Sequence, residues 1–166
     1  MLGSLRTWEF GVMRLFRIER EKYLQAVLTG AGAAANSSGR WNVKHTPLVY
    51  TAESRSLAFL EVLVHLDAAM DLPSDRFMVE LEIPSDCQVL KLSEHELPNG
   101  WDAPIPGDHT RSIGTQFAAS LAAPVLQVPS AIVAGEFNCL INPKHPQAQG
   151  IRVVRTVPLK FDERLK

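Results

Sequence analysis

The chain has 166 residues, of which 46% are hydrophobic and 21% charged, and its formal net charge is −1. This composition is that of a folded protein of about one domain, and it excludes an intrinsically disordered chain. The near-neutral charge argues against a general nucleic-acid-binding surface, which needs a clear basic excess, so we expect no direct binding of nucleic acid.

Targeting and cysteine signals favour a cytoplasmic protein. The N-terminus has no basic segment followed by an apolar one, and no stretch is apolar for long enough to span a bilayer. The two cysteines, Cys87 and Cys139, lack CxxC spacing. We expect no membrane association and two small buried thiols, with a single disulfide as the alternative.

The first part of the chain begins with an expected extension, residues 1–12, ahead of a second methionine, Met13. The run 13–18 predicts the first strand, and 19–28 has helical propensity. Residues 29–39, TGAGAAANSSG, follow as a loop of small side chains. This loop either lets the backbone approach a ligand closely or is a flexible surface loop.

Two further helices are predicted. The first spans 55–66, with Ser54 as its N-cap, and its apolar residues on nearly every face predict burial on most sides. The second begins at a cap provided by Thr110 or Ser112 and ends near residue 122.

The remaining elements are strands and loops. The β-favouring runs are 47–51, 77–83, 88–92, 125–133, 137–141 and 151–157. Pro129 interrupts one of them, which predicts an edge strand or a bulge. A Pro/Gly-rich loop covers 99–109, and Asn142-Pro143 predicts a turn. No repeat or linker divides these elements, so we expect one α+β domain over 13–166.

The sharpest candidate for chemistry is Glu61, in the apolar helical run LAFLEVLVHL. Helical spacing surrounds it with Leu57, Leu60, Val64 and His65. A charge in such surroundings needs a cation or hydrogen-bond donors. It is therefore either a functional carboxylate or a structural one that His65 or an arginine satisfies.

Three other positions could bind a ligand. Arg40 follows Ser-Ser-Gly in the small-residue loop, where an arginine suits a phosphate or carboxylate, although loop arginines are more often solvated. Arg17, in the apolar strand LFRI, either faces solvent or is a second anion ligand. Tyr50 ends an apolar run and is either a core aromatic or a stacking platform for a ring.

Familiar catalytic and metal motifs are missing from the sequence. Ser130, in VPSAIV, lacks the G-x-S-x-G elbow of a hydrolase, but its hydroxyl suits a ligand phosphate or ribose. Asn138 precedes the Asn-Pro turn and belongs to that turn by default. The histidines show no HExxH or paired-ligand spacing, and no P-loop or G-x-G-x-x-G occurs, so we expect no metal site.

The ordered set of motifs resembles the RES domain, the toxin of bacterial RES–Xre toxin–antitoxin systems. The matching stretches are LFRI, GRWN, TPLVYTAES, LAFLEVLVHL, LQVPSAIVAGEFNCLINPKHP and FDERL. They follow one another in this order over nearly all of residues 13–166. Many relatives carry a glycine where this chain has Lys-His-Thr at 44–46, and we expect this difference to alter a turn and not the chemistry.

This resemblance implies the fold of the ADP-ribosyltransferase toxins, a split mixed β-core with flanking helices. It implies destruction of NAD+ by cleavage of the nicotinamide–ribose bond, with phosphate or water as acceptor. NAD+ is then a substrate, phosphate a co-substrate, and no cofactor is required. The implied partner is a helix-turn-helix antitoxin that blocks the active site, with a homodimer within the complex as a further expectation.

The resemblance also assigns the site residues. The family's catalytic residues fall on Glu61, Arg40 and Tyr50, and its substrate-binding residues on Arg17 and Ser130, to which we add Asn138 from the same matching stretch. Cleavage of an N-glycosidic bond develops positive charge on the ribose, which a preorganised carboxylate stabilises. Nicotinamide is a good leaving group, so no strong general acid is needed.

Two other functions remain open at this point. One is a protein ADP-ribosyltransferase toxin that modifies a metabolic enzyme. The other is a non-catalytic binding module whose main role is the antitoxin complex. The acceptor depends on the shapes of loops such as 98–110, which the sequence does not decide.

Overall fold

The structure, a computed structural model, describes residues 5–6, 12–37, 39–66 and 72–165. The strands are β1 (Leu5–Arg6), β2 (Met13–Arg20), β3 (Val49–Ala52), β4 (Arg76–Ile83), β5 (Val89–Lys91), β6 (Val125–Pro129), β7 (Phe137–Ile141) and β8 (Arg152–Pro158). The α-helices are α1 (Ala31–Ala35), α2 (Arg55–Leu63) and α3 (Asp108–Ser120). Short 3-10 helices are η1 (Glu21–Ala26), η2 (Glu94–Glu96), η3 (Pro146–Gly150) and η4 (Glu163–Leu165).

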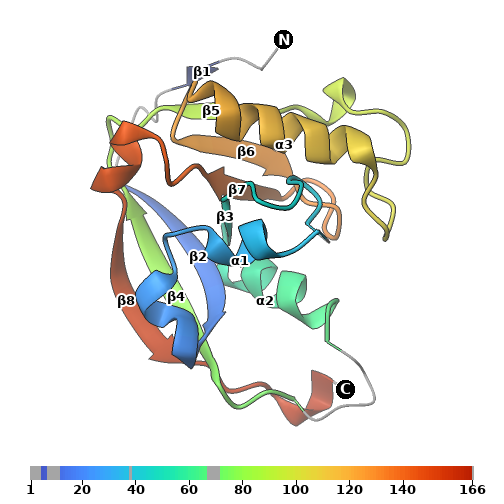
Figure 1. Ribbon diagram of the computed structural model, residues 1–166. Helices are drawn as coiled ribbons and strands as arrows, with labels where there is room; N and C mark the ends of the chain where they lie inside the picture. Colours follow the sequence, from blue (N-terminus) through green and yellow to red (C-terminus); the bar gives the residue numbers. More distant parts are fainter. Residues whose placement is uncertain (1–4, 7–11, 38, 67–71, 166) are drawn as a thin grey trace.

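The described strands form one eight-stranded sheet in the order β1-β5-β6-β7-β3-β2-β4-β8 (Figure 1). Strands β5 and β6 are parallel, and the other neighbours are antiparallel. Strand β2 pairs with β4 along its whole length but meets β3 only where Phe16 lies opposite Ala52. The sheet is therefore split between β2 and β3, and the mixed, split α+β core is confirmed.

The two halves of the sheet share a core on one face and diverge on the other. On the shared face, Leu15 and Val79 pack in one buried cluster with Val125 and Cys139 from the other half. On the opposite face, a cluster that includes Phe117 packs α3 against β5, β6 and β7. A separate cluster packs α2 against β2, β3 and β4. This separation of two clusters on one face leaves room for a cleft between them.

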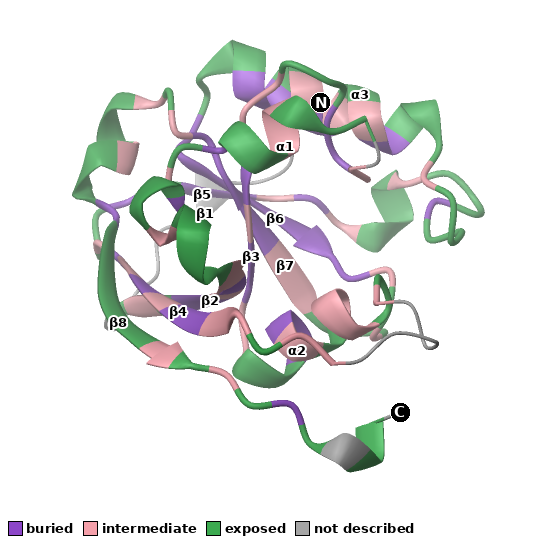
Figure 2. Ribbon diagram, turned by 60° about the horizontal axis from the view of Figure 1, so that its bottom comes forward, coloured by how far each residue is buried: buried purple, intermediate pink, exposed green. Residues whose placement is uncertain are grey.

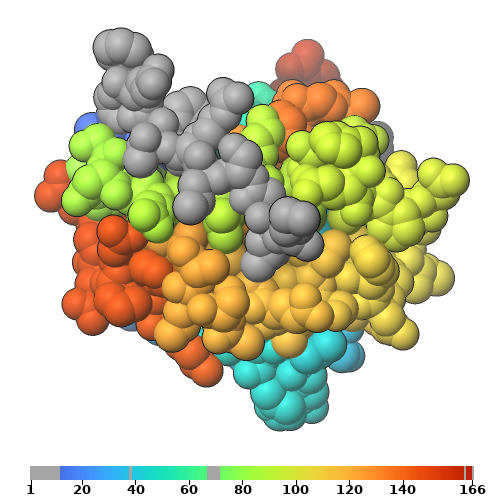
Figure 3. Space-filling model, turned by 90° about the horizontal axis from the view of Figure 1, so that it is seen from above, coloured from blue at the N-terminus to red at the C-terminus, as the bar shows by residue number. Residues whose placement is uncertain are grey.

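The views show the same layering. Strand β6 is buried along its length, whereas β8 at the edge of the sheet is largely exposed (Figure 2). Seen from above, α3 covers the upper face between the loop that precedes it and η3 (Figure 3). Gly114 of α3 lies against the backbone of Trp41, where an added Cβ would be 1.8 Å from the carbonyl oxygen. This close approach anchors α3 over residues 39–42.

Several local predictions are confirmed. Ser54 caps α2, because its hydroxyl accepts a hydrogen bond from the Leu57 amide at 3.0 Å. Asn142 begins the predicted turn, and its side chain accepts from the Lys144 amide at 3.1 Å. Cys87 and Cys139 are free and buried, and burial raises the pKa of the Cys87 thiol to about 11.

Two predictions for the first part of the chain are wrong. The segment 19–28 is not a single helix, because β2 continues to Arg20, which pairs with Arg76 of β4, and the 3-10 helix η1 follows. The loop 29–39 contains the short helix α1. Within the expected extension, Leu5–Arg6 pairs with β5, and residues 1–4 and 7–11 lie outside the described residues.

The predictions for the two other helices are also corrected. Helix α2 is not buried on most sides, since Leu60 and Val64 are exposed. Helix α3 begins at Asp108 with Gly107 as its N-cap, not at Thr110 or Ser112.

Strand β6 is neither an edge strand nor bulged, because it lies between β5 and β7. Pro129 is its last residue, and β5 pairs only as far as Gln127, so the missing proline N–H breaks no ladder bond on that side.

The turn at residues 44–46 contains a backbone conformation that favours glycine. His45 has a φ of 71°, in the left-handed region that favours glycine, and its amide donates to the Ala34 carbonyl at 2.8 Å. His45 thus adopts a left-handed conformation in the segment that links α1 to β3.

Candidate active site

A cleft of about 1060 Å³ opens between the α2 and α3 sides of the split sheet. Its floor includes Phe16 and Ile18 of β2, and its walls come from α2, α1 and the loop before α3. Five of the six predicted site residues line it: Arg17, Arg40, Tyr50, Glu61 and Asn138. The fold thus brings into one cleft residues that are spread over most of the chain.

Glu61 is fixed by two side chains from the neighbouring strands. Its Oε1 accepts a hydrogen bond from the Ser130 hydroxyl at 3.3 Å and another from the Asn138 amide nitrogen. Both hydrogen bonds from the described residues end on Oε1, and Glu61 lines the cleft. These partners are neutral donors, and no ion pair joins Glu61 to His65 or to an arginine within the part of the chain that the structure describes.

Ser130 lies behind Glu61 and outside the cleft lining. Its side chain is buried, at 5% exposure for the residue. Its hydroxyl oxygen accepts from the amides of Ile132 at 3.1 Å and Val133 at 3.2 Å, which directs its own proton to Glu61. Ser130 thus orients the carboxylate, whereas Asn138 both contacts the carboxylate and lines the cleft.

Tyr50 joins β3 to the loop that carries Arg40. Its hydroxyl donates to Asn42 Oδ1 at 2.7 Å and accepts from the Trp41 amide at 3.0 Å. Burial raises the pKa of Tyr50, so the hydroxyl stays protonated. Both hydrogen bonds hold the hydroxyl in place, and the side chain forms part of the cleft wall.

Gly39 explains why this part of the loop needs a small residue. A Cβ at this position would be 2.3 Å from Asn42 Oδ1 and 2.9 Å from the Tyr50 hydroxyl. Any side chain here would displace the hydrogen-bonded pair. The small-residue loop therefore has a specific packing role beside the cleft.

Arg40 ties the small-residue loop to the loop before α3. Its guanidinium donates to the carbonyls of Trp101 at 2.5 Å and Ala103 at 2.8 Å. Burial lowers the pKa of Arg40, while Glu61, Asp102 and Tyr50 act in the opposite direction. Because both partners are neutral carbonyls, the positive charge of Arg40 is not cancelled by a contacting carboxylate.

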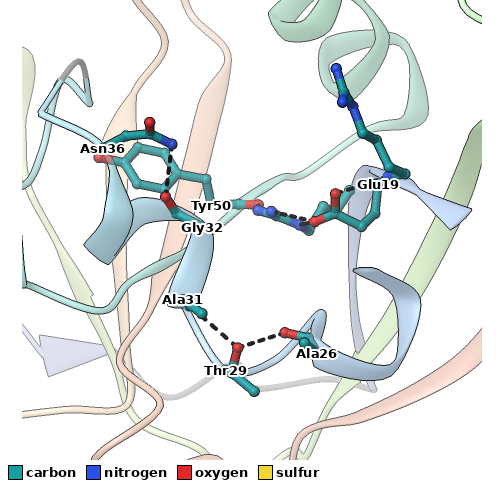
Figure 4. Close-up of polar contacts among 9 residues, drawn as sticks. Glu19, Ala26, Thr29, Ala31, Gly32, Asn36 and Tyr50 are labelled. Atoms are coloured by element: carbon teal, nitrogen blue, oxygen red, sulfur yellow. Dashed lines mark hydrogen bonds and ion pairs between the residues drawn. The ribbon is translucent and has the colours of Figure 1, made fainter. Parts of the chain in front are cut away.

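Arg17 follows Phe16, the residue at which β2 meets β3. Figure 4 labels its two partners, Glu19 and Tyr50. It donates to the Tyr50 carbonyl at 2.9 Å and forms an ion pair with Glu19 at 2.7 Å. The Arg17 guanidinium is therefore held by protein groups and is not free in solvent. It links β2 to β3 across the split in the sheet, and Arg17 also lines the cleft.

Comparison with known proteins identifies the family. The RES domain model matches residues 14–162. The chain belongs to the RES domain family. The expectation of a RES-domain toxin and of its fold is confirmed.

The RES domain relatives cover most of the chain. It is 44% identical over 142 residues to the protein named Prs ADP-ribosylating toxin of Sphingobium sp. strain YBL2, which covers 83% of this chain and 86% of that protein. It is 36% identical to Toxin Res of Yersinia enterocolitica, over 93% of this chain and 100% of the relative. It is 37% identical to Toxin Res of Photorhabdus laumondii, over 92% and 97%.

A solved structure shares the fold. A chain from the crystal structure of the M. tuberculosis MbcT–MbcA toxin–antitoxin complex superposes with a TM-score of 0.71 at 20% identity. The match covers 90% of this chain and 85% of that chain.

The RES domain cleft also contains residues that the sequence did not single out. Trp41 and Asn42 form its inner wall, and Arg111 reaches it from α3. Trp41 and Asn42 belong to the GRWN motif but were not predicted as site residues, and nothing in the sequence pattern indicated Arg111. Among the described residues, no group of three or more His, Cys, Asp or Glu side chains is placed to hold a metal ion. Within the same ranges, no helix has the length and apolar character needed to cross a membrane.

Proposed function

We propose that this RES-domain protein is a toxin that breaks the nicotinamide–ribose bond of NAD+, with phosphate or water as acceptor. The observation that carries the proposal is the oriented carboxylate of Glu61 in a cleft that also contains Arg40 and Tyr50. The cleft, at about 1060 Å³, is at the upper end of the range for small-ligand sites and suits a dinucleotide.

The proposed reaction needs charge stabilisation more than proton transfer. The bond between ribose C1′ and the nicotinamide nitrogen breaks, and its electron pair neutralises the pyridinium as nicotinamide leaves. Positive charge develops on the ribose, and the Glu61 carboxylate stabilises it. An oxygen of hydrogen phosphate or water then bonds to the same ribose carbon, which is C1″ of the product. The product is ADP-ribose 1″-phosphate, or ADP-ribose once the added water has released a proton to solvent, and neither route changes an oxidation state.

The other site residues position the substrate or the carboxylate. Arg40 binds the diphosphate, with Arg17 as a second, more distant cation. Tyr50 presents its ring to the nicotinamide or ribose. Ser130 and Asn138 orient the Glu61 carboxylate beside the ribose by their hydrogen bonds to it. Asn138 also lines the cleft and contacts the substrate.

A second candidate is transfer of ADP-ribose to a protein, a metabolic enzyme. It is favoured by the 44% identical relative, whose name describes an ADP-ribosylating toxin. The same cleavage chemistry serves both functions, and the acceptor distinguishes them. The purified protein should be incubated with NAD+ labelled in the adenylate, with phosphate alone and with cell lysate.

The location of the label separates the candidates. Label in ADP-ribose 1″-phosphate or ADP-ribose supports NAD+ consumption, and label on a protein band supports transfer. Intact NAD+ under both conditions contradicts both enzymatic functions. It would leave the non-catalytic binding module as the remaining function.

The proposed partner is an antitoxin with a helix-turn-helix domain that covers the cleft, in a complex that contains a toxin homodimer. The cleft rim supports such a cover, because it carries exposed apolar residues on both sides. Ile105, at 85% exposure, lies on the loop before α3, and Val64 and Ile132 lie on the α2 side. Co-purification with the antitoxin should abolish NAD+ loss, and a complex that consumes NAD+ at the free rate would contradict this cover.

A further inference from the structure

Besides Arg17 and Arg40, a third arginine reaches the cleft from the α3 side. Arg111 lies in the first turn of α3, and its side chain is 23% exposed. Its Nε donates to the Gly39 carbonyl at 3.3 Å. Gly39 directly precedes Arg40, so α3 and the small-residue loop bring two guanidinium groups to the same part of the cleft.

The charge of Arg111 is weakly compensated. Its ion pair is with Asp108, one turn earlier on α3, at 3.3 Å, and that carboxylate is fully exposed. Exposed pairs of this kind contribute little and are screened by salt. The other acidic residue facing this part of the cleft is Asp102, which is also exposed. A ligand anion that excludes water would compete effectively for Arg111.

The Tyr50 hydroxyl is affected by the charges of both arginines. The charges of both Arg40 and Arg111 lower the pKa of its hydroxyl, against the larger effect of burial. Both guanidinium groups are therefore within electrostatic reach of the same oxygen.

We propose that Arg111 and Arg40 form a two-arginine clamp for the diphosphate of the dinucleotide. This inference rests on the proposed function. Guanidinium groups bind phosphate oxygens in pairs with charge-assisted hydrogen bonds, and two adjacent phosphates match two converging arginines. Arg111 is then a substrate-positioning residue, and its removal affects binding more than the chemical step.

The test compares NAD+ kinetics of the wild type with those of Arg111→Ala, Arg111→Lys and Arg152→Ala. Arg152 is an exposed arginine of β8 paired with Glu82, outside the cleft, and serves as the matched control. The Arg111→Ala variant should raise KM roughly tenfold or more and leave kcat within about threefold. Arg111→Lys should recover part of the affinity, since it keeps the charge, and Arg152→Ala should match the wild type.

A structural role would give a different pattern. Lysine has no Nε donor for the Gly39 carbonyl, so a purely structural Arg111 predicts that the lysine variant is as impaired as the alanine variant. That outcome, or an unchanged KM for Arg111→Ala, overturns the clamp.

Calorimetric binding of ADP-ribose keeps the clamp separate from the proposed reaction. If the wild type binds ADP-ribose but leaves NAD+ intact, the proposed function fails, while roughly tenfold weaker binding by Arg111→Ala still supports the clamp. Equal binding by both proteins, or no binding by the wild type, overturns the clamp, whereas the proposed reaction is judged by NAD+ loss alone.

Discussion

Replacement of Glu61 by glutamine removes the negative charge that we propose lies beside the ribose. The amide keeps an oxygen at the position where Oε1 accepts from Ser130 and Asn138, so the packing of α2 against the sheet should persist. Two unit charges about 4 Å apart interact by about 4 kcal/mol at an effective dielectric of about 20. A ribosyl cation carries part of a unit charge, so the loss should be about 3 kcal/mol, or roughly a hundredfold in kcat.

The assay is loss of NAD+ by the purified protein, followed by chromatography, with thermal unfolding measured in parallel. Glu53→Gln is the matched control, because Glu53 is another partly buried glutamate held by a side-chain amide, that of Gln127, and it does not line the cleft. The control should keep the wild-type rate. A folded Glu61→Gln variant with wild-type kcat would refute the proposed role of the carboxylate.

Three further predictions concern stability. Tyr50→Phe should cost about 1–3 kcal/mol in urea denaturation, because buried Asn42 loses its donor; an unchanged midpoint would refute this. Gly39→Ala should cost about 1–3 kcal/mol by overpacking, whereas Gly32→Ala in α1, where a Cβ meets nothing within 4 Å, should not; equal effects would contradict the packing argument. Burial raises the pKa of Glu53, so the wild type loses stability as pH rises through that pKa. Glu53→Gln should be the more stable protein at neutral pH and lose this advantage on acidification, and a pH-independent difference would count against it.

The strands were predictable where local patterns decide the structure. Alternating apolar residues and a closing proline define β4, and Ser54 fixes the start of α2 by a bond to an amide three residues away. The position of a strand in the sheet is set by tertiary pairing. Pro129 therefore pointed to an edge, although β6 is central, because the sequence does not show where its neighbour β5 ends.

The site was predictable only in part, because its contacts are long-range. Ser130 and Asn138 meet Glu61 across 69 and 77 positions of the chain, which no local spacing reveals. The ordered family motifs pointed to these residues, but the sequence alone gave no geometry. Arg111 contacts Gly39, 72 positions away in the chain, and lies outside those motifs. Its position beside the cleft follows only from the packing of α3.

The exposed face of α2 has a related explanation. Val64 looked like a core residue from its neighbours in sequence, but it lies on the cleft rim. A helix that borders a binding cleft exposes apolar residues which a sequence pattern assigns to the core.

Cleavage of the nicotinamide–ribose bond at Glu61 is tested most directly by release of nicotinamide from NAD+ by the purified, antitoxin-free protein, with the Glu61→Gln variant beside it. The wild type should release one nicotinamide for each NAD+ lost, and the variant should release nicotinamide at a rate roughly a hundredfold lower. NAD+ loss without nicotinamide release, or no loss by a folded wild-type protein in phosphate buffer and in lysate, would contradict it.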